Sequence, residues 1–178
     1  MTRQLKRTAI HEAGHAVMHY LERVPFERVT IGAASLPGAD GAVHPRVGPL
    51  WLWDRQRPKT LRICMAGKVA EEFHTGRPVK RGCEHDMNLA GCIADELSSD
   101  ADSLLAAAYV ATRIRLTAAT TWPAVEALAS ALVQRQALNA RQAYRVIRQA
   151  LPSTASSRND LEGRGPHGPA AATNEGRK

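Results

Sequence analysis

The sequence predicts a mostly α-helical domain of the α+β class, in which a small, irregular β element accompanies the helices. Three observations lead to this prediction. Apolar residues recur at three- and four-residue intervals over most of residues 3–151. The segment from Gly32 to Pro58 is instead rich in Gly and Pro. Just before it, the β-branched run Val29-Thr30-Ile31 favours a strand.

The first helix is predicted to span Arg3 to Arg23. Thr2 is a suitable N-cap because its hydroxyl can accept a hydrogen bond from the first turn, and Pro25 lies beyond the expected end. Gly14 costs this helix about 1 kcal/mol relative to alanine, so close approach of a neighbouring helix or of a ligand cage is expected there. Small and apolar residues form a stripe at helical spacing: Leu5, Ala9, Ala13, Ala16, Val17 and Tyr20.

A strand is expected next, within Val24 to Ala33, where the β-branched run lies. Two short pieces of the following Gly- and Pro-rich segment are predicted to pair as further strands, Ala42-Val43-His44 and Leu50-Trp51-Leu52-Trp53. In a strand Trp51 and Trp53 point to the same face, where core packing is favoured over a peptide groove because large aromatic side chains mainly contribute buried area.

Five further helices are predicted from apolar spacing and from residues typical of helix ends. They are expected from near Pro58 to Gly76, from Asp86 onward, over residues 100–116, over residues 122–136, and from the cap residue Asn139 to about Leu151. Residues 1–151 are therefore predicted to form one domain. Residues 152–178 contain Leu161 as their one large aliphatic residue, so they are predicted to be a disordered tail.

Composition excludes several classes of protein. The net charge is +7, but the basic residues are scattered and only 4% of residues are aromatic, so a nucleic-acid-binding role is disfavoured. The three cysteines contain no Cys-x-x-Cys pair, which argues against a disulfide scaffold and a thiolate zinc knuckle. There is no long apolar run and no apolar signal core, so we expect a soluble, cytoplasmic protein without a membrane anchor.

The first helix contains a His-Glu-x-x-His pattern, formed by His11, Glu12 and His15. The two histidines lie about 40° apart around the helix axis and one turn apart along it, so both imidazoles can reach one metal ion. Glu12 projects about 100° from His11 and suits a general base better than a third ligand. In zinc peptidases the cation lowers the pKa of its water towards about 7, and a carboxylate beside it removes the proton.

A catalytic zinc site needs a third protein ligand, and spacing alone does not identify it. A carboxylate from a later helix suits a hydrolytic zinc ion, whereas a thiolate is a softer choice. Glu71 and Glu72 can alternatively be solvated or bind a ligand histidine, and Asp86 can be a plain N-cap. The candidates are Asp86, His85, Cys83, Glu71, Glu72, His74 and His44.

Three blocks follow one another along the chain: Thr8-Ala9-Ile10-His11-Glu12-Ala13-Gly14-His15-Ala16-Val17, then Ala66-Gly67-Lys68-Val69-Ala70-Glu71-Glu72-Phe73 with Thr75-Gly76 after it, then Gly82-Cys83-Glu84-His85-Asp86-Met87. Together they resemble the peptidase domain of the FtsH family, the ATP-dependent zinc metalloproteases. The second block resembles that family's Gly-(Arg/Lys)-x-Ala-Glu-Glu helix. The third resembles its Gly-Ala-x-Asn-Asp-(Leu/Ile) element, whose final Asp is the third zinc ligand.

The resemblance covers roughly residues 3–151 and implies a helical zinc-peptidase domain with a small β element near the site. It implies that His11, His15 and Asp86 bind Zn²⁺ and that Glu12 is the catalytic base. Two features depart from the family. His85 stands where the family has Asn, and the sequence contains neither a Gly-x-x-x-x-Gly-Lys-(Ser/Thr) phosphate loop nor a membrane anchor, so ATP dependence is not expected of this chain alone.

The function that follows is a zinc-dependent endopeptidase acting on unfolded or flexible protein chains. An ATPase partner supplied in trans and assembly into a homo-oligomer are two hypotheses about its partners. The alternative is a catalytically weak zinc-binding domain used as an interaction or regulatory module. Glu12 favours the enzyme, because a purely structural site has no use for a base beside the metal and closes its fourth position with a protein ligand.

Overall fold

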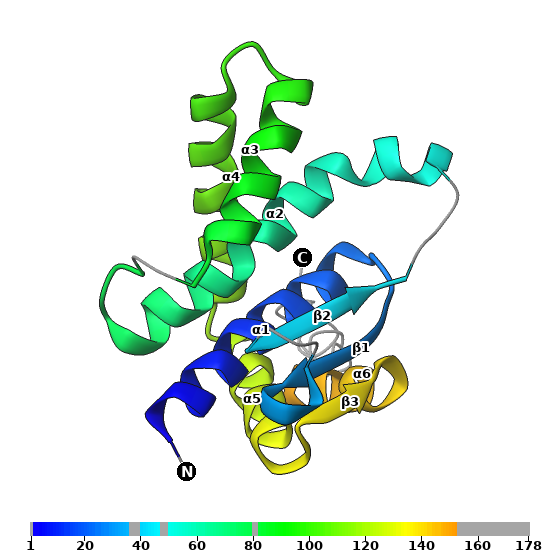
Figure 1. Cartoon of the computed structure of the whole chain (residues 1–178), viewed down its shortest axis with the longest axis vertical. Helices are drawn as coiled ribbons and strands as arrows, with labels where there is room; N and C mark the ends of the chain where they lie inside the picture. The colour runs from blue at the N-terminus through cyan, green and yellow to red at the C-terminus, as the bar shows by residue number, and fades with distance from the viewer. Residues whose placement is uncertain (1, 36–39, 47–49, 80–81, 153–178) are drawn as a thin grey trace, which may run out of the picture.

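The computed structural model describes residues 2–35, 40–46, 50–79 and 82–152, and within these ranges it contains six α-helices and a small antiparallel sheet that lies beside α1, α5 and α6 (Figure 1). The prediction of a mostly α-helical α+β fold is confirmed. No helix in these ranges is both long enough and apolar enough to cross a membrane. Apart from Pro152, the predicted tail lies outside the described residues, so its disorder and the domain boundary stay predictions.

Helix α1 (Arg3–Glu22) is the central helix of the fold. As predicted, the Thr2 hydroxyl caps it by accepting a hydrogen bond from the N–H of Leu5 at 3.3 Å. Its end is fixed by Arg23, which adopts a left-handed conformation with φ of 57°. Every residue from Thr8 to His19 is buried, so the polar side chains of this stretch need partners inside the protein.

The sheet has the strand order β2-β1-β3, with both pairs antiparallel. Strands β1 (Phe26–Ile31) and β2 (Gly41–Pro45) were predicted, and the short 3₁₀ helix η1 (Gly32–Ala34) follows β1. Strand β3 (Ala137–Asn139) was not predicted, because three residues are too few for an alternating pattern. Val29, at the centre of β1, lies between Val43 and Leu138 in the register.

Helix α2 (Leu50–Thr75) corrects two predictions. Residues 50–53 were predicted to be a strand but form the first turn of this helix, and Pro58, predicted near its start, lies inside it. A short apolar run fits both helix and strand, and proline usually marks a helix start, so the pattern was ambiguous. The side chains of Trp51 and Trp53 lie outside the described part of the structure. The predicted end is confirmed, since Gly76 follows with φ of 66°.

Helix α3 (Glu84–Leu97) begins two residues before the predicted start at Asp86. Cys83 occupies the N-cap position without a side-chain hydrogen bond, and Asp86 therefore lies in the first turn instead of capping the helix. Its carboxylate is free to serve another purpose. Helix α4 (Ala101–Leu116) packs against α3 and is capped by Asp100, whose side chain accepts a hydrogen bond from the N–H of Ser103 at 3.1 Å.

The last two helices are close to their predicted bounds. Helix α5 (Trp122–Arg135) has Pro123 in its first turn, as expected. Asn139 caps α6 (Ala140–Ala150) in a capping box: the N–H of Gln142 donates to Asn139 Oδ1 at 2.9 Å, and the N–H of Asn139 donates to the Gln142 side chain at 3.0 Å.

Two hydrophobic clusters organise the molecule, and α2 contributes to both. The larger lies between α1, the sheet, α5 and α6, whereas the smaller lies between α2, α3 and α4. In Figure 1 the α3–α4 hairpin accordingly stands on one side of α2, and the sheet stands on the other. Ala66 and Val69 of α2 belong to the larger cluster, and Leu61 and Met65 belong to the smaller one.

Gly14 explains how closely α1 and α2 approach each other. A methyl group added there would lie 2.7 Å from the carbonyl oxygen of Ala66 and 2.7 Å from Cβ of Ala70. Of the two explanations considered for this glycine, the structure shows close packing against a neighbouring helix. This contact brings the histidine face of α1 against α2.

A buried carboxylate joins three helices at the far end of α1. Glu22 is 6% exposed and accepts two hydrogen bonds of 2.8 Å from Arg62 of α2, in the two-pronged geometry that guanidinium and carboxylate groups favour. Arg115 of α4 also donates to it. Although burial acts to raise the pKa of Glu22, the two arginines lower it below the usual 4.5.

We expect Glu22→Gln to destabilise the protein by about 1–3 kcal/mol, because it removes the charge that both guanidinium groups face. Because the folded-state pKa is lowered, the contribution of the carboxylate is complete above the unfolded pKa and is lost as pH falls through the folded value. Urea denaturation should therefore show the difference between wild type and Glu22→Gln at pH 7 and a shrinking difference below about pH 4.5. Glu126→Gln, an exposed change on α5, is the matched control. Equal stabilities at pH 7 would contradict this prediction.

Candidate metal centre

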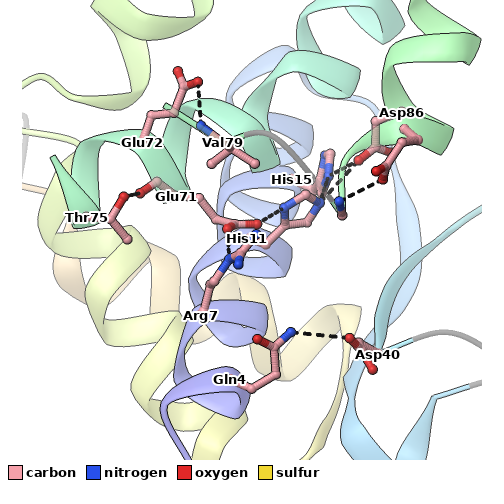
Figure 2. Close-up of polar contacts among 12 residues, drawn as sticks. Gln4, Arg7, His11, His15, Asp40, Glu71, Glu72, Thr75, Val79 and Asp86 are labelled. Atoms are coloured by element: carbon pink, nitrogen blue, oxygen red, sulfur yellow. Dashed lines mark hydrogen bonds and ion pairs between the residues drawn. The ribbon is translucent and has the colours of Figure 1, made fainter. Parts of the chain in front are cut away.

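Three side-chain atoms from two helices converge beside α2. His11 Nε2 lies 3.0 Å from His15 Nε2 and 3.2 Å from Asp86 Oδ2, and His15 Nε2 lies 3.1 Å from the same oxygen. Figure 2 shows the two imidazoles and the Asp86 carboxylate pointing toward one another. Among the described residues these three form the group of side chains that could hold a metal ion.

The local structure explains this convergence. His11 and His15 lie one turn apart on α1, so their rings stand one above the other with centroids 4.7 Å apart. Asp86 reaches them from the first turn of α3. Both histidines are 7% exposed and thus sheltered from solvent, whereas the Asp86 side chain is 24% exposed.

Nδ1 of each histidine, the outer ring nitrogen that faces away from the converging group, has its own hydrogen-bond partner. That partner fixes the tautomer of the ring. His15 Nδ1 lies 2.8 Å from the carbonyl oxygen of Ile63 on α2, and because a carbonyl oxygen only accepts, that nitrogen carries the hydrogen. His11 Nδ1 lies 2.8 Å from Oε1 of Glu71, which acts in the same way. In the neutral rings both Nε2 atoms therefore present lone pairs to each other and to Asp86.

Three electron-pair donors at this spacing fit a zinc ion. Bonds of about 2.0–2.2 Å in a tetrahedral arrangement place ligand atoms about 3.3–3.6 Å apart. The observed separations of 3.0–3.2 Å are slightly shorter than that range. Imidazole nitrogen and carboxylate oxygen are also ligands that zinc accepts, and three protein ligands leave a fourth position for water or substrate.

The electrostatics of the site favour positive charge between these groups. Burial acts to lower the pKa of His11, but hydrogen bonds to Asp86 and Glu71 raise it to about 10. Burial likewise acts to raise the pKa of Asp86, and the two histidines lower it far below its usual range. A buried cluster of this kind is stabilised by a cation at its centre.

Glu12 lies beside this group on α1 and is 6% exposed. Burial raises the pKa of Glu12 above its usual range, although His15 and His11 act in the opposite direction. It lines the same cleft as the three converging residues. A carboxylate in this position can accept a proton from water held in the cleft.

The cleft has a volume of about 1250 Å³ and runs between α1, β2 and the start of α3. Strand β2 is an edge strand of the described sheet, and Gly41, Ala42, Val43 and Pro45 line the cleft. On the other side, apolar lining comes from Ile63 of α2 and Leu89 of α3. This volume exceeds the roughly 300–1,000 Å³ that is typical of small-molecule pockets.

The other candidates for a third ligand have different environments. Cys83 is buried at the start of α3, and burial raises the pKa of its thiol. His44 lies on β2 with its Nε2 3.3 Å from the hydroxyl of Thr30. Glu72 accepts a hydrogen bond from the hydroxyl of Tyr109 at 2.5 Å and another from the N–H of Val79 at 3.1 Å. Figure 2 shows the second bond and the Glu72 side chain pointing away from the site. His74 and His85 are exposed, although His85 reaches the rim of the cleft.

Of the two alternatives that the sequence left open for Glu71, a solvated side chain or a partner of a ligand histidine, the structure shows the second. It is 4% exposed, and its second oxygen accepts a hydrogen bond from Nε of Arg7. It thus links His11 to a cation on the preceding turn of α1 (Figure 2). His19, which sequence reasoning did not single out, continues the histidine face, but its Nδ1 lies 3.1 Å from the carbonyl oxygen of Val24. Burial lowers the pKa of His19 to about 4, so it stays neutral.

We expect Glu71→Gln to weaken zinc binding by about 10–100-fold, the usual cost of losing a partner that orients a metal-binding histidine. The glutamine oxygen can still accept one hydrogen bond, from His11 or from Arg7. The amide hydrogens would then face the N–H of the other residue, so that hydrogen bond would be lost. Glu72→Gln is the control, because the neighbouring carboxylate points away from the site. Competition titration with a zinc chelator measures both affinities, and equal values would show that Glu71 does not support the site.

Comparison with known proteins matches the part of the chain that holds this site. The model of peptidase family M41 matches residues 1–100. The ATP-dependent zinc metalloprotease FtsH of Borreliella burgdorferi (strain ZS7) is 31% identical over 100 residues, which are 55% of this chain. The match covers 16% of that relative's length, so the chain corresponds to a small part of it.

Proposed function

Because this chain belongs to peptidase family M41, we propose that it is a zinc-dependent endopeptidase that hydrolyses unfolded or flexible protein chains. The observation that supports this most directly is the convergence of three electron-pair donors beside a buried glutamate in one cleft. On this proposal His11, His15 and Asp86 bind zinc, and Glu12 is the catalytic base.

Each of these residues has a defined task in peptide hydrolysis. A zinc ion supplies a Lewis acid for the scissile carbonyl and for water. The Glu12 carboxylate accepts the proton of the attacking water and then donates it to the departing amine nitrogen. Glu71 and the carbonyl of Ile63 keep the outer nitrogens of the two histidines protonated, so that the inner nitrogens remain free to bind metal.

The cleft supports a polypeptide as the substrate. An edge strand has backbone N–H and C=O groups without a strand partner on one side, and an extended peptide can bind to them. Strand β2 is such an edge in the described sheet, and it lines the cleft that holds the site. Recognition through the backbone requires an extended chain, so folded proteins are poor substrates unless something unfolds them.

That requirement extends the proposal to a partner. The matched relative is ATP-dependent by name, and this chain matches only 16% of it. We therefore include an ATPase acting in trans, and a homo-oligomer that would present several clefts to one chain, as parts of the proposal. A zinc-binding interaction module with little activity is the alternative, and the position of Glu12 in the cleft favours the enzyme.

Hydrolysis of fluorescently labelled casein by the purified chain tests the proposal, since casein is largely unfolded and needs no unfolding partner. We expect cleavage that 1,10-phenanthroline abolishes and added Zn²⁺ restores. No hydrolysis by the zinc-loaded protein, alone or with a candidate ATPase, would favour the interaction module.

A further inference from the structure

Two glycines lie directly against the side chains of the site. Gly67 is on α2, and a methyl group added there would lie 2.4 Å from Nε2 of His11 and 2.4 Å from Nε2 of His15. Both distances are far below van der Waals contact. Any side chain at this position would occupy space around the two atoms proposed to bind zinc.

The histidines have little freedom to move away from position 67. Each ring is buried and bound through Nδ1, to Glu71 in one case and to the carbonyl of Ile63 in the other. Helix α2 packs closely against α1 where Gly14 faces Ala66 and Ala70, and a movement of α2 away from the histidines would open this contact. A methyl group at position 67 would therefore displace the Nε2 atoms of the two histidines.

Gly41 makes the corresponding contact with the proposed base. A methyl group added at this first residue of β2 would lie 2.6 Å from Cγ of Glu12 and 2.7 Å from its Oε1. The backbone of Gly41 thus forms one wall of the space that holds the Glu12 carboxylate. These atoms belong to the far part of a long side chain, so the side chain would move before the strand did.

The backbone on either side of Gly41 is held in place. Gly41 is paired with Ile31 across the sheet, and the preceding carbonyl, that of Asp40, accepts a hydrogen bond of 2.7 Å from the N–H of Gly32. Gln4 of α1 donates to the Asp40 carboxylate at 3.4 Å, as drawn in Figure 2. The start of β2 is thereby tied to both β1 and α1.

We propose that Gly67 and Gly41 are positioning residues with separate tasks: Gly67 keeps the space around the two histidine nitrogens clear for zinc, and Gly41 sets the position of the Glu12 carboxylate. The proposal rests on the proposed function for the identity of the metal and the base. It predicts that one added methyl group abolishes metal binding at one position, whereas at the other it impairs hydrolysis without loss of metal.

The first test is zinc affinity, measured by chelator competition on the full chain. Gly67→Ala should bind zinc at least about 100-fold more weakly than wild type, because the added carbon displaces two ligand atoms together. Its circular dichroism should remain that of a folded helical protein. A folded Gly67→Ala protein with wild-type zinc affinity would overturn the assignment of Gly67, whether or not the protein proves to be a peptidase.

The second test is casein hydrolysis by zinc-loaded Gly41→Ala. We expect wild-type zinc affinity and KM, with kcat lower by about 100-fold, since misplacement of a reacting group by about 1 Å can cost that much. A crystal structure of this variant should show the Glu12 side chain displaced. An undisplaced Glu12 would overturn the assignment of Gly41 even if wild type fails to cleave casein, so failure of the proposed function is distinguishable.

Another glycine in the chain provides a matched control. Gly91 of α3 has no atom within 4 Å of an added methyl group, so Gly91→Ala should keep wild-type zinc affinity and kcat. If Gly67→Ala and Gly41→Ala lowered only the melting temperature and left zinc affinity and kcat unchanged, both would be ordinary packing positions and the proposal would be wrong.

Discussion

Glu12→Gln is expected to lose about 10²–10⁴-fold in kcat for casein while retaining zinc and fold. An amide has nearly the same shape as the carboxylate, but it cannot take up the proton of the attacking water. The three proposed ligands are unchanged, so the zinc affinity should stay within a few-fold of wild type. Replacing a buried charge by a neutral amide should also leave stability similar or higher, because burial disfavours the ionised form of Glu12.

The measurement needs zinc content and rate on the same preparation. Metal analysis establishes the stoichiometry, and initial rates at several casein concentrations separate kcat from KM. Glu27→Gln, an exposed change on β1, controls for the loss of one negative charge. If zinc-loaded Glu12→Gln were as active as wild type, Glu12 would not be the catalytic base and the proposed mechanism would be wrong.

The second large effect is expected for Asp86→Ala. Removing one of three ligands should reduce zinc affinity by more than the 10–100-fold typical of changes outside the ligand shell, so about 10³-fold or more is expected. The remaining two histidines would keep their partners Glu71 and Ile63, and a change in metal binding would therefore report on the carboxylate itself. Dialysis against a weak chelator followed by metal analysis measures the loss.

Two neighbouring residues are the informative comparisons for Asp86. His85 stands beside it at the rim of the cleft, and Cys83 precedes the helix that carries it. His85→Ala and Cys83→Ala should both retain zinc, since neither side chain joins the three converging atoms. If Asp86→Ala retained zinc fully and one of the other two variants lost it, the third ligand would be that other residue. This result would contradict the ligand set that the family resemblance implied.

Local patterns explain which parts of the fold could be predicted. The helices with caps, such as the one beginning after Asn139, were predicted within a residue or two because their end signals are local. The start of α2 was missed because Leu50 to Trp53 fits two kinds of structure and Pro58 mimics a helix start. Strand β3 was missed because its pairing with β1 depends on a distant part of the chain.

The candidate site divides in the same way. His11, Glu12 and His15 lie on one helix, so their spacing alone indicates a metal-binding site with an adjacent catalytic base. Asp86 is distant in sequence, and only the resemblance to a known family selected it from the other candidates. The sequence around Gly41 and Gly67 does not indicate which atoms they approach, because those atoms belong to α1, which is distant from both along the chain.

The placement of the proposed ligands on either side of α2 has a thermodynamic consequence. His11 and His15 belong to the helix at the centre of the larger hydrophobic cluster, whereas Asp86 belongs to the hairpin that closes the smaller one. An ion bound by all three would behave as an additional cross-link between two clusters that already share residues of α2 and α4. Its binding energy would then add to their cooperativity, by RT ln(1 + [Zn²⁺]/Kd), and the two clusters would unfold together at high zinc and more independently as zinc becomes scarce.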